Sequence, residues 1–469
     1  MRRREFLKTT GLAIAGTILN RSRLFAVSGE KRPNILLIIT DQQSGTMLSC
    51  APNKWVKTPA MDSIMNKGMR FEKAYATNPV CVPSRFSLMT GFYPSSVGLR
   101  KNGNSEAAKQ FVGGALGHVF QKAGYETVYG GKVHLPGVMG KITNCGFRNL
   151  TSDQRDELAD ACAEFLKGRH DKPFLLVASF INPHDICYQA IQAHSGSSRN
   201  VSRAIKVMRE AERMPEGITR EVFFSKHCPP LPDNYEPTDR EPEAISVFVK
   251  SRPFKQYVRE NWTDEDWRVH RWTYARLTER VDRQIGKVLG ALRQAGLEDN
   301  TVVVFTSDHG DMDASHRTEH KSMSYEESAR IPLMIQYPPM TKGGYVDNEH
   351  LVSNGLDIFP TLCDLARVPY QGELPGLSLR PLLNGNSVPT WRKYLMIESE
   401  LCRAITDGRY KYSLFDMAGP EEMLCDLRND PGEMKNLAGL RKHARVLRRM
   451  RAALAEEARK HGVKIYPSG

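Results

Sequence analysis

The sequence lacks any internal apolar stretch of about 20 residues, the length that an α-helix needs to cross a bilayer. Its nine cysteines include none of the close pairs that are typical of zinc sites. No internal repeat or low-complexity segment is present either. These absences exclude a helical membrane protein, a zinc-finger domain and a solenoid.

What is present is the composition of a globular protein. Of the 469 residues, 40% are hydrophobic and 25% are charged, which is the usual balance for a chain with a packed core. The length favours about two to four structural units. The formal net charge of +13 makes the surface basic, and a basic surface concentrates anionic ligands.

The first 28 residues differ in composition from the rest. Arginines at positions 2–4 precede an apolar run, Thr9–Leu19, and small residues lead to Ser28. This order resembles a twin-arginine export signal, and its apolar run is too short for a stable membrane anchor. We expect cleavage near Ser28, a partner in the twin-arginine export machinery, and a periplasmic or secreted protein. Since residues 1–28 carry six positive charges and one negative charge, the net charge of the remainder is about +8.

Three apolar segments have the composition of strands buried on both faces. They are residues 34–40, 174–179 and 301–306, and each is followed at once by polar residues that include His and Asp. Residues 272–294 place apolar side chains on one stripe, which predicts a helix. Alternating strands and helices indicate an α/β fold, with a mixed, mostly parallel sheet covered by helices on both faces. Ligands bind beyond the carboxyl ends of such strands.

Two other regions define the expected domain organisation. Residues 189–270 are polar, charged and interrupted by prolines, so they predict a long surface excursion that carries substrate-contacting loops. Residues 403–412 contain an Asp-Gly turn between strand-like segments, which is typical of a hairpin. We expect a catalytic domain over 29–385. A smaller C-terminal subdomain over 386–469 would consist of an antiparallel sheet and a terminal helix.

The most informative segment is residues 81–91, Cys-Val-Pro-Ser-Arg-Phe-Ser-Leu-Met-Thr-Gly. It resembles, without a mismatch, the type I sulfatase signature Cys-x-Pro-Ser-Arg-x-x-x-x-Thr-Gly. Taken alone, Cys81 could be a buried structural cysteine before a turn, but six identities at fixed spacing favour function. The chain resembles this family of the alkaline phosphatase superfamily from about residue 32 to residue 437.

The resemblance implies an unusual nucleophile. In the family a maturase oxidises the signature cysteine, here Cys81, to formylglycine (3-oxoalanine), whose aldehyde hydrates to a geminal diol. One hydroxyl attacks sulfur and the other later ejects sulfate, a form of covalent catalysis. Arg85, four residues further on, would stabilise the diol.

The resemblance also implies one divalent metal. Asp41 and the pair Asp308-His309 stand at the family's two metal-binding positions, with Gln42 and Cys81 as further ligands. Oxygen ligands favour Ca²⁺, with Mg²⁺ or Mn²⁺ as alternatives. The family commonly has Asp in place of Gln42 and Asn in place of His309, and this Gln and His pair resembles the choline sulfatase and phosphonate monoester hydrolase branch. Asp41 without these companions would be interpreted as a helix cap.

Four more residues take catalytic roles by resemblance. Lys132 and His134 stand in the family's Gly-Lys-x-His segment, His184 in its Pro-His element, and Lys321 at the end of the fourteen-residue segment Asp-x-Gly-Asp-x-x-x-x-His-x-x-x-x-Lys. Lys132 would bind a sulfate oxygen, and His134 would take the proton whose removal releases sulfate. His184 or Lys321 would protonate the leaving oxygen.

The predicted activity is therefore a sulfuric ester hydrolase that acts on a sulfated small molecule or glycan, with no nucleic acid as partner. Two alternatives remain open. Gln42 and His309 favour a phosphonate or phosphate ester hydrolase of the same superfamily. A secreted, non-catalytic glycan-binding relative is the other alternative.

Overall fold

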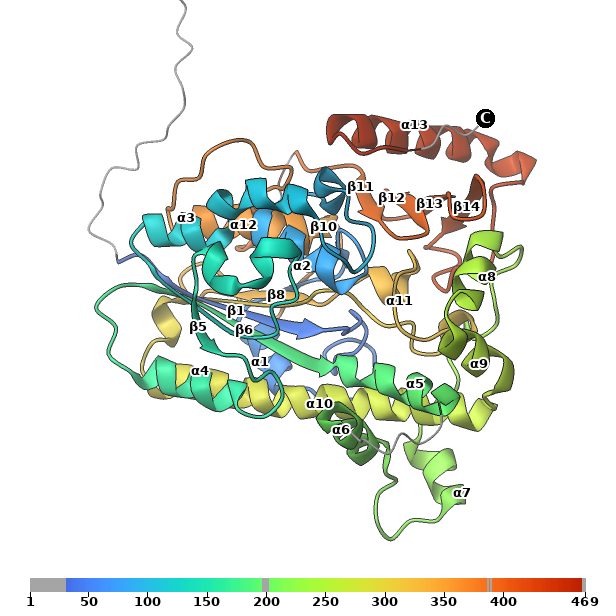
Figure 1. The fold of residues 1–469 in the computed structure, drawn as a ribbon, viewed down its shortest axis with the longest axis horizontal. Coiled ribbons are helices and arrows are strands. Elements are labelled where there is room, and N and C mark those ends of the chain that lie inside the picture. Colours follow the sequence, from blue (N-terminus) through green and yellow to red (C-terminus); the bar gives the residue numbers. More distant parts are fainter. Residues whose placement is uncertain (1–30, 196–201, 386–387, 389, 466–469) are drawn as a thin grey trace, which may run out of the picture. The chain divides into compact units, whose positions relative to one another are not determined.

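The computed structural model describes residues 31–195, 202–385, 388 and 390–465 (Figure 1). The predicted export signal lies outside the described residues. Within these ranges, no helix has both the length and the apolar character needed to cross a membrane.

An eight-stranded sheet forms the centre of the fold. Its strands are β1 (Asn34–Asp41), β2 (Met69–Phe71), β4 (Glu126–Gly131), β5 (Arg148–Thr151), β6 (Phe174–Pro183), β7 (Thr301–Ser307), β8 (Leu333–Gln336) and β9 (Tyr345–Asp347). They lie in the order β5-β4-β6-β1-β7-β8-β2-β9. The five strands from β5 to β7 pair in parallel, and β8 is antiparallel to both of its neighbours. The predicted mixed, mostly parallel sheet is confirmed.

The position of β1 inside the sheet explains why its residues 35–39 are all apolar. Every residue of β1 is buried. Ile35, Leu37 and Ile39 face one apolar core, while Leu36 and Ile38 face the other, because successive side chains of a strand point to opposite faces of the sheet. A strand covered on both faces needs apolar residues at each position.

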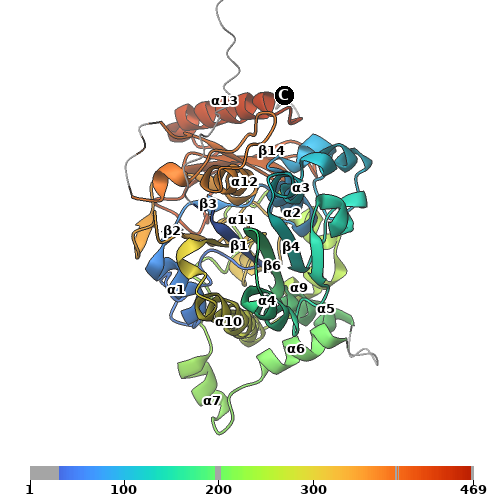
Figure 2. The same cartoon turned by 90° about the vertical axis from the view of Figure 1, so that its left-hand side faces the viewer.

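Helices cover both faces of the sheet (Figure 2). The helices α2 (Cys81–Thr90), α3 (Leu116–Lys122) and α12 (Asn354–Leu365) contribute to one core, and α1 (Pro59–Lys67), α4 (Leu158–Lys167) and α10 (Asp264–Gln294) to the other. The α10 helix contains the predicted helix 272–294. It begins with a capping box, in which the side chains of Thr263 and Asp266 each bind the other residue's backbone N–H.

Residues 189–195 and 202–270 are largely helical. They include most of α5 (Cys187–Ser195), then α6 (Arg203–Glu212), α7 (Arg220–Val222), α8 (Glu243–Lys250), α9 (Pro253–Asn261) and the start of α10. Phe223, Phe248 and Trp267 of this segment are fully buried. The segment is polar on average because its short helices are amphipathic and bury only one side. Among them, α9 packs against α5.

A second sheet lies near the C-terminus. Its strands β11 (Leu395–Glu398), β12 (Cys402–Thr406), β13 (Tyr410–Phe415) and β14 (Glu421–Asp426) pair antiparallel in chain order. The predicted hairpin joins β12 to β13, and α13 (Ala444–Lys460) packs its apolar side on this sheet. The antiparallel C-terminal sheet is thus confirmed. Smaller elements are β3 (Ala74–Tyr75), β10 (Val352–Ser353) and α11 (Glu326–Ala329).

Candidate active site

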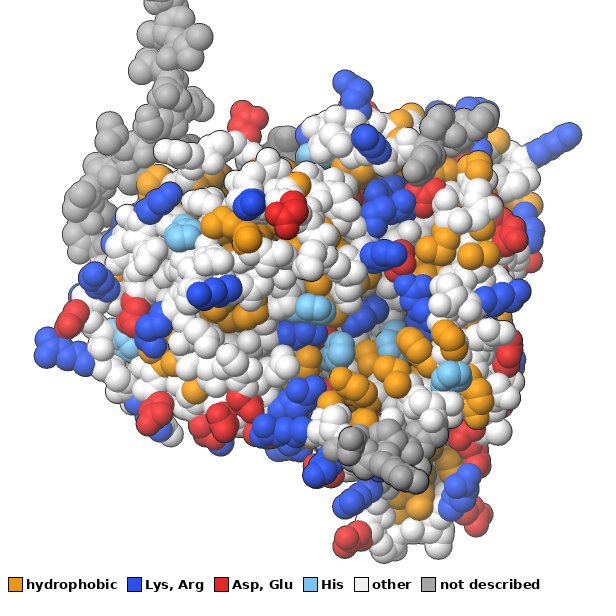
Figure 3. Space-filling model, viewed as in Figure 1, with side chains coloured by type: hydrophobic (Ala, Val, Ile, Leu, Met, Phe, Trp, Pro, Cys, Tyr) orange, Lys and Arg blue, Asp and Glu red, His pale blue; other side chains and the backbone are white. Residues whose placement is uncertain are grey.

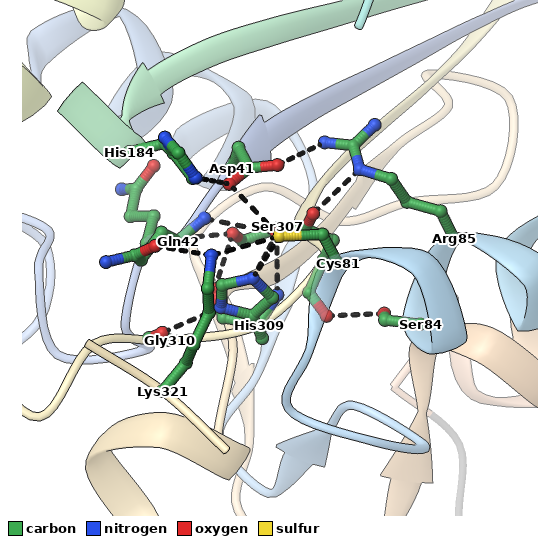
Figure 4. A network of polar contacts seen from close by, with 12 residues as sticks. Asp41, Gln42, Cys81, Ser84, Arg85, His184, Ser307, His309, Gly310 and Lys321 are labelled. Carbon is green, nitrogen blue, oxygen red and sulfur yellow. Dashed lines mark hydrogen bonds and ion pairs between the residues drawn. The ribbon is translucent and has the colours of Figure 1, made fainter. Parts of the chain in front are cut away.

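Four parallel strands bring polar residues to one edge of the sheet. Asp41 is the last residue of β1, and His184 directly follows β6. Asp308 and His309 directly follow β7, and Lys132 directly follows β4. Because parallel strands share a carboxyl edge, residues far apart in sequence meet there (Figure 4).

Gly131 allows Lys132 to reach this edge. Its φ is +90°, and a Cβ at this position would lie 2.1 Å from the carbonyl oxygen of Ser179. Only glycine accepts both the left-handed backbone and such close contact with β6. Lys132 Nζ then lies 2.6 Å from Asp41 Oδ2.

Cys81 is the first residue of α2 and is fully buried. Its Sγ lies 3.0 Å from Lys321 Nζ, 3.1 Å from His309 Nε2 and 3.9 Å from Lys132 Nζ. Burial and the nearby Asp41 would raise the pKa of the thiol, but Lys132, Lys321 and His309 outweigh them and hold the pKa well below its ordinary range. The site is therefore built to stabilise negative charge at this position.

Arg85 joins the two acidic strand ends. Its Nε donates to Asp308 Oδ2 and its Nη2 to Asp41 Oδ2, both at 2.8 Å. Its Nη1 donates to the Lys132 carbonyl at 2.9 Å and to Ser179 Oγ at 2.8 Å. A planar guanidinium can bind two carboxylates in fixed geometry, so Arg85 sets the spacing between Asp41 and Asp308.

Asp41, Cys81, Asp308 and His309 form one buried group of metal-type donors. One ligand atom from each lies within 4.8 Å of the others. The ring of His309 is oriented by its Nδ1, which pairs with the Gly310 carbonyl at 2.8 Å and leaves Nε2 directed at the group. An outer hydrogen bond of this kind is usual for metal-ligating histidines. The donor set therefore fits a divalent metal.

The two carboxyl groups of this set differ in acidity. Burial raises the pKa of Asp308 to about 6, with the charge of Asp41 acting in the same direction. Burial also acts against ionisation of Asp41, but Lys132, His184 and Arg85 hold its pKa well below its usual range. Asp41 is therefore the permanent anion of the pair.

The side chain of Gln42, whose role as a metal ligand stays a prediction, makes hydrogen bonds at both of its amide atoms. Its Oε1 accepts from Lys321 Nζ at 2.8 Å, and its Nε2 donates to Asp311 Oδ2 at 2.6 Å. Its backbone N–H donates to Asp308 Oδ1 at 3.1 Å. The Gln42 side chain thus links Lys321 to Asp311.

His184 and His134 are placed differently. His184 Nε2 lies 3.9 Å from Asp41 Oδ1. Burial, together with Lys132 and Lys321, lowers the pKa of His184 to about 3, so its imidazole is neutral near pH 7. His134 is exposed and, within the described part of the chain, has no hydrogen bond or ion pair. Its predicted contact with the nucleophile stays a prediction.

Sequence reasoning missed three residues that support the site. Ser179 accepts from Arg85, Asp311 from Gln42, and the Tyr274 hydroxyl donates to the Gln42 carbonyl at 2.6 Å. Ser179 ends a predicted strand, and Asp311 lies in the fourteen-residue segment 308–321. The sequence therefore contained a feature that could have pointed to each of them. Tyr274 lies in the apolar stripe of α10, where nothing in the sequence pointed to a polar role.

Comparison with known proteins decides the family. The family model named Sulfatase matches residues 33–368, well over half of the chain. The chain belongs to the sulfatase family. A second model, named N-sulphoglucosamine sulphohydrolase, C-terminal, matches residues 314–460. The predicted family and enzyme class are confirmed, and the chain is a sulfatase.

Several relatives cover almost the whole chain. A Δ4,5-hexuronate-2-O-sulfatase from Bacteroides thetaiotaomicron is 29% identical, with 95% of this chain and 91% of the relative aligned. An N-acetylglucosamine-6-O-sulfatase from the same organism is 26% identical over 92% of this chain and 87% of its own length.

Solved structures agree in fold. A 2-O glycosaminoglycan (GAG) sulfatase has a TM-score of 0.77 at 27% identity, covering 92% of this chain and 93% of its own. A second structure, in complex with its substrate D-glucosamine-2-N,6-O-disulfate, has a TM-score of 0.68 at 25% identity, covering 92% and 98%.

Proposed function

We propose that this sulfatase releases inorganic sulfate from a sulfated saccharide, with formylglycine made from Cys81 as nucleophile. The observation that carries the proposal is the environment of Cys81 Sγ. It is buried at a helix N-terminus beside Lys321, His309 and Lys132, where an anionic ester would be drawn in and its charge stabilised.

The Cys81 Sγ stands in for the oxygens of the hydrated aldehyde. A maturase is a required partner, since the thiol itself is not the family's nucleophile. Asp308 would accept the proton of the attacking hydroxyl. His134, two residues after Lys132 and exposed, would later take the proton of the second hydroxyl.

Two lysines would bind the sulfate oxygens. Lys132 Nζ and Lys321 Nζ approach Cys81 Sγ at 3.9 and 3.0 Å, so a sulfate group held at the nucleophile would lie between them. Lys321 would protonate the leaving oxygen, while His184, which is neutral near pH 7, would bind sulfate. Arg85 would stabilise the charge that develops, chiefly by holding Asp41 and Asp308 in place.

Asp41, Asp308 and His309, together with the modified Cys81, would hold the divalent metal, for which Ca²⁺ is the first expectation and Mg²⁺ or Mn²⁺ the alternatives. When bound, the metal supplies positive charge that polarises a sulfate oxygen. Gln42 would act beside this set as the link that orients Lys321.

The relatives support a saccharide substrate, because their names specify sulfated uronate and glucosamine units. The surface agrees. Figure 3 shows lysine, arginine and histidine side chains gathered over the carboxyl ends of β1 and β6, beside apolar side chains. We place sugar recognition in residues 189–270 and in the C-terminal subdomain, over 386–469.

The deciding experiment combines mass spectrometry with sulfate release. Protein from the native host is alkylated, and the peptide that carries Cys81 is weighed to measure conversion to the aldehyde. The converted enzyme is then assayed on a 2-O-sulfated unsaturated uronate disaccharide and on 6-O-sulfated N-acetylglucosamine, each paired with the matching phosphate ester. Cys81→Ala is the control.

Each outcome has a clear meaning. Aldehyde plus sulfate release that is lost in Cys81→Ala supports the proposal. Faster cleavage of the phosphate esters would favour the alternative hydrolase. Glycan binding without turnover by verified aldehyde protein would favour a non-catalytic relative. Unchanged turnover in both Lys321→Ala and His184→Ala would contradict their assigned roles.

Export is part of the same proposal. Residues 1–28 would direct the folded protein through the twin-arginine machinery to the periplasm or beyond. The double variant Arg3→Lys, Arg4→Lys should accumulate in the cytoplasm, as measured by fractionation of the native host. Unchanged export of this variant would exclude the twin-arginine route.

A further inference from the structure

The loop that carries Lys321 has an unusual backbone. Between positions 311 and 322, six residues other than glycine have a positive φ: Asp313, Ala314, His316, Arg317, His320 and Ser322. Such residues rarely adopt this conformation, and each instance costs free energy. The loop therefore keeps its shape only because the surrounding structure holds it.

The 189–270 region supplies most of the contacts that hold this loop. The Asn234 carbonyl accepts from His316 N–H at 2.7 Å, and Thr238 Oγ1 lies 3.2 Å from the Nδ1 of the same histidine. Arg271, just beyond the region, pairs with Asp313 at 3.2 Å. These contacts hold the first half of the loop, away from Lys321 in the chain.

The 189–270 region also contacts the half of the loop that carries Lys321. Lys255, on α9, donates from Nζ to the Glu319 carbonyl at 2.6 Å and to its Oε2 at 2.9 Å. Both side chains are buried, at 5% and 1% exposure. A buried ion pair with a second bond to the backbone fixes both position and direction.

Lys321 lies between two anchors of the loop. Lys255 holds Glu319 on one side, and on the other side Ser322 N–H donates to the Pro79 carbonyl at 3.0 Å, two residues before Cys81. From this span Lys321 Nζ reaches Cys81 Sγ at 3.0 Å. Loss of either anchor would let the ammonium group move relative to the nucleophile.

We propose that Lys255 is a positioning residue for Lys321, acting through its buried pair with Glu319. The inference rests on the proposed function, because it takes from there the role of Lys321 toward sulfate and the leaving oxygen. It adds that the 189–270 region, through α9, holds part of the catalytic loop.

The test measures dependence on the leaving group. Wild type, Lys255→Met and Lys321→Ala, all matched for formylglycine content, are assayed on sulfate esters whose leaving groups span a wide range of pKa. If Lys255 positions the proton donor, Lys255→Met should lose about 10- to 100-fold in kcat on poor leaving groups. It should lose little on nitrophenyl sulfate, whose leaving oxygen needs no proton, and Lys255→Arg should recover part of the rate.

Arg271→Met is the matched control. It removes a different ion pair from the same loop, eight residues before Lys321, and should leave the slope of log kcat against leaving-group pKa unchanged. A uniform loss across all esters in Lys255→Met, or a slope equal to that of wild type, would overturn the proposal.

The two hypotheses fail in distinguishable ways. If Lys321→Ala has the wild-type slope, the role of Lys321 as proton donor in the proposed function is wrong. If Lys321→Ala steepens the slope and Lys255→Met does not, only the positioning role is wrong. If Lys255→Met does not fold, Glu319→Gln replaces it in the test. This variant keeps the hydrogen bond from Lys255 to the Glu319 carbonyl, so it must steepen the dependence on leaving-group pKa to a smaller extent. A wild-type slope for Glu319→Gln would again overturn the proposal.

Discussion

Replacing Lys411 by methionine should destabilise the protein by about 3–5 kcal/mol, the usual cost of leaving a buried charge without its partner. Lys411 lies on β13 and is 2% exposed. Its Nζ lies 2.9 Å from Glu326 Oε1 on α11 and 2.9 Å from the carboxylate of Glu433, which is itself 2% exposed. Methionine would fill a similar volume but would leave Glu433 without a cation and Glu326 with only Arg330, whose Nε lies 3.5 Å from Glu326 Oε2.

Chemical denaturation followed by circular dichroism measures this loss as a shift in midpoint at constant slope. A loss below about 1 kcal/mol would refute the reasoning, because it would mean that this ion cluster contributes no more than a surface pair. The double variant Lys411→Met, Glu433→Gln should recover part of the loss, since the carboxylate that Lys411→Met leaves without a cation is then absent.

The loss should also depend on pH. Burial raises the pKa of Glu433 to about 8, against the attraction of Lys411, whereas an unfolded glutamate titrates near about 4.3. For an acid raised in the folded state, the stabilising contribution is complete below about pH 4.3 and is lost as pH rises through about 8. At pH 5.5 Glu433 can be neutral, so Lys411→Met should cost less there than at pH 8. Equal losses at both pH values would contradict this assignment.

Three further predictions concern the active site. Arg85→Met should lower turnover by about 100-fold or more. Arg85→Lys should not restore turnover, because lysine cannot bind both carboxylates at once. Near-normal sulfate release by Arg85→Lys would contradict the assigned role. If the metal is present at 100 times its Kd, its removal by a chelator should lower the free energy of unfolding by about 2.7 kcal/mol. Calorimetry measures this change, with Ca²⁺, Mg²⁺ or Mn²⁺ then added back one at a time. An unchanged melting temperature would argue against the metal site. Gly310→Ala would place a Cβ 1.9 Å from the Glu327 carbonyl oxygen and so displace the adjacent Asp308-His309 segment; wild-type yield and activity would show that the contact is readily relieved.

Much of the fold and part of the site could be predicted because they depend on local patterns. A strand buried on both faces must be apolar at every position, so β1, β6 and β7 were visible as continuous runs. Their carboxyl ends share one edge of a parallel sheet, so Asp41, Asp308 and their neighbours could be expected together. The Asp-Gly pair at 407–408 likewise predicts its hairpin through turn geometry alone.

Residues 189–270 were harder to predict. Helices that bury only a narrow face are polar on average, so Phe248 and Trp267 gave no clear periodicity among charged residues and prolines. The partners that bury them come from other parts of the chain. The same limit applies to Gln42, whose side chain lies beside Lys321, 279 residues later in the sequence.

The sequence by itself determined the family signature, the nature of the nucleophile that it implies, and which strands end in acidic or basic residues, because these depend on residue identity and short-range spacing. Tertiary structure alone decided which atoms meet. Arg85 binds both Asp41 and Asp308. Gln42 accepts a hydrogen bond from Lys321, and Lys255 donates one to Glu319. The physical reason is that hydrogen bonds and ion pairs act over about 3 Å, and distances of that kind between remote residues exist only after the chain has folded.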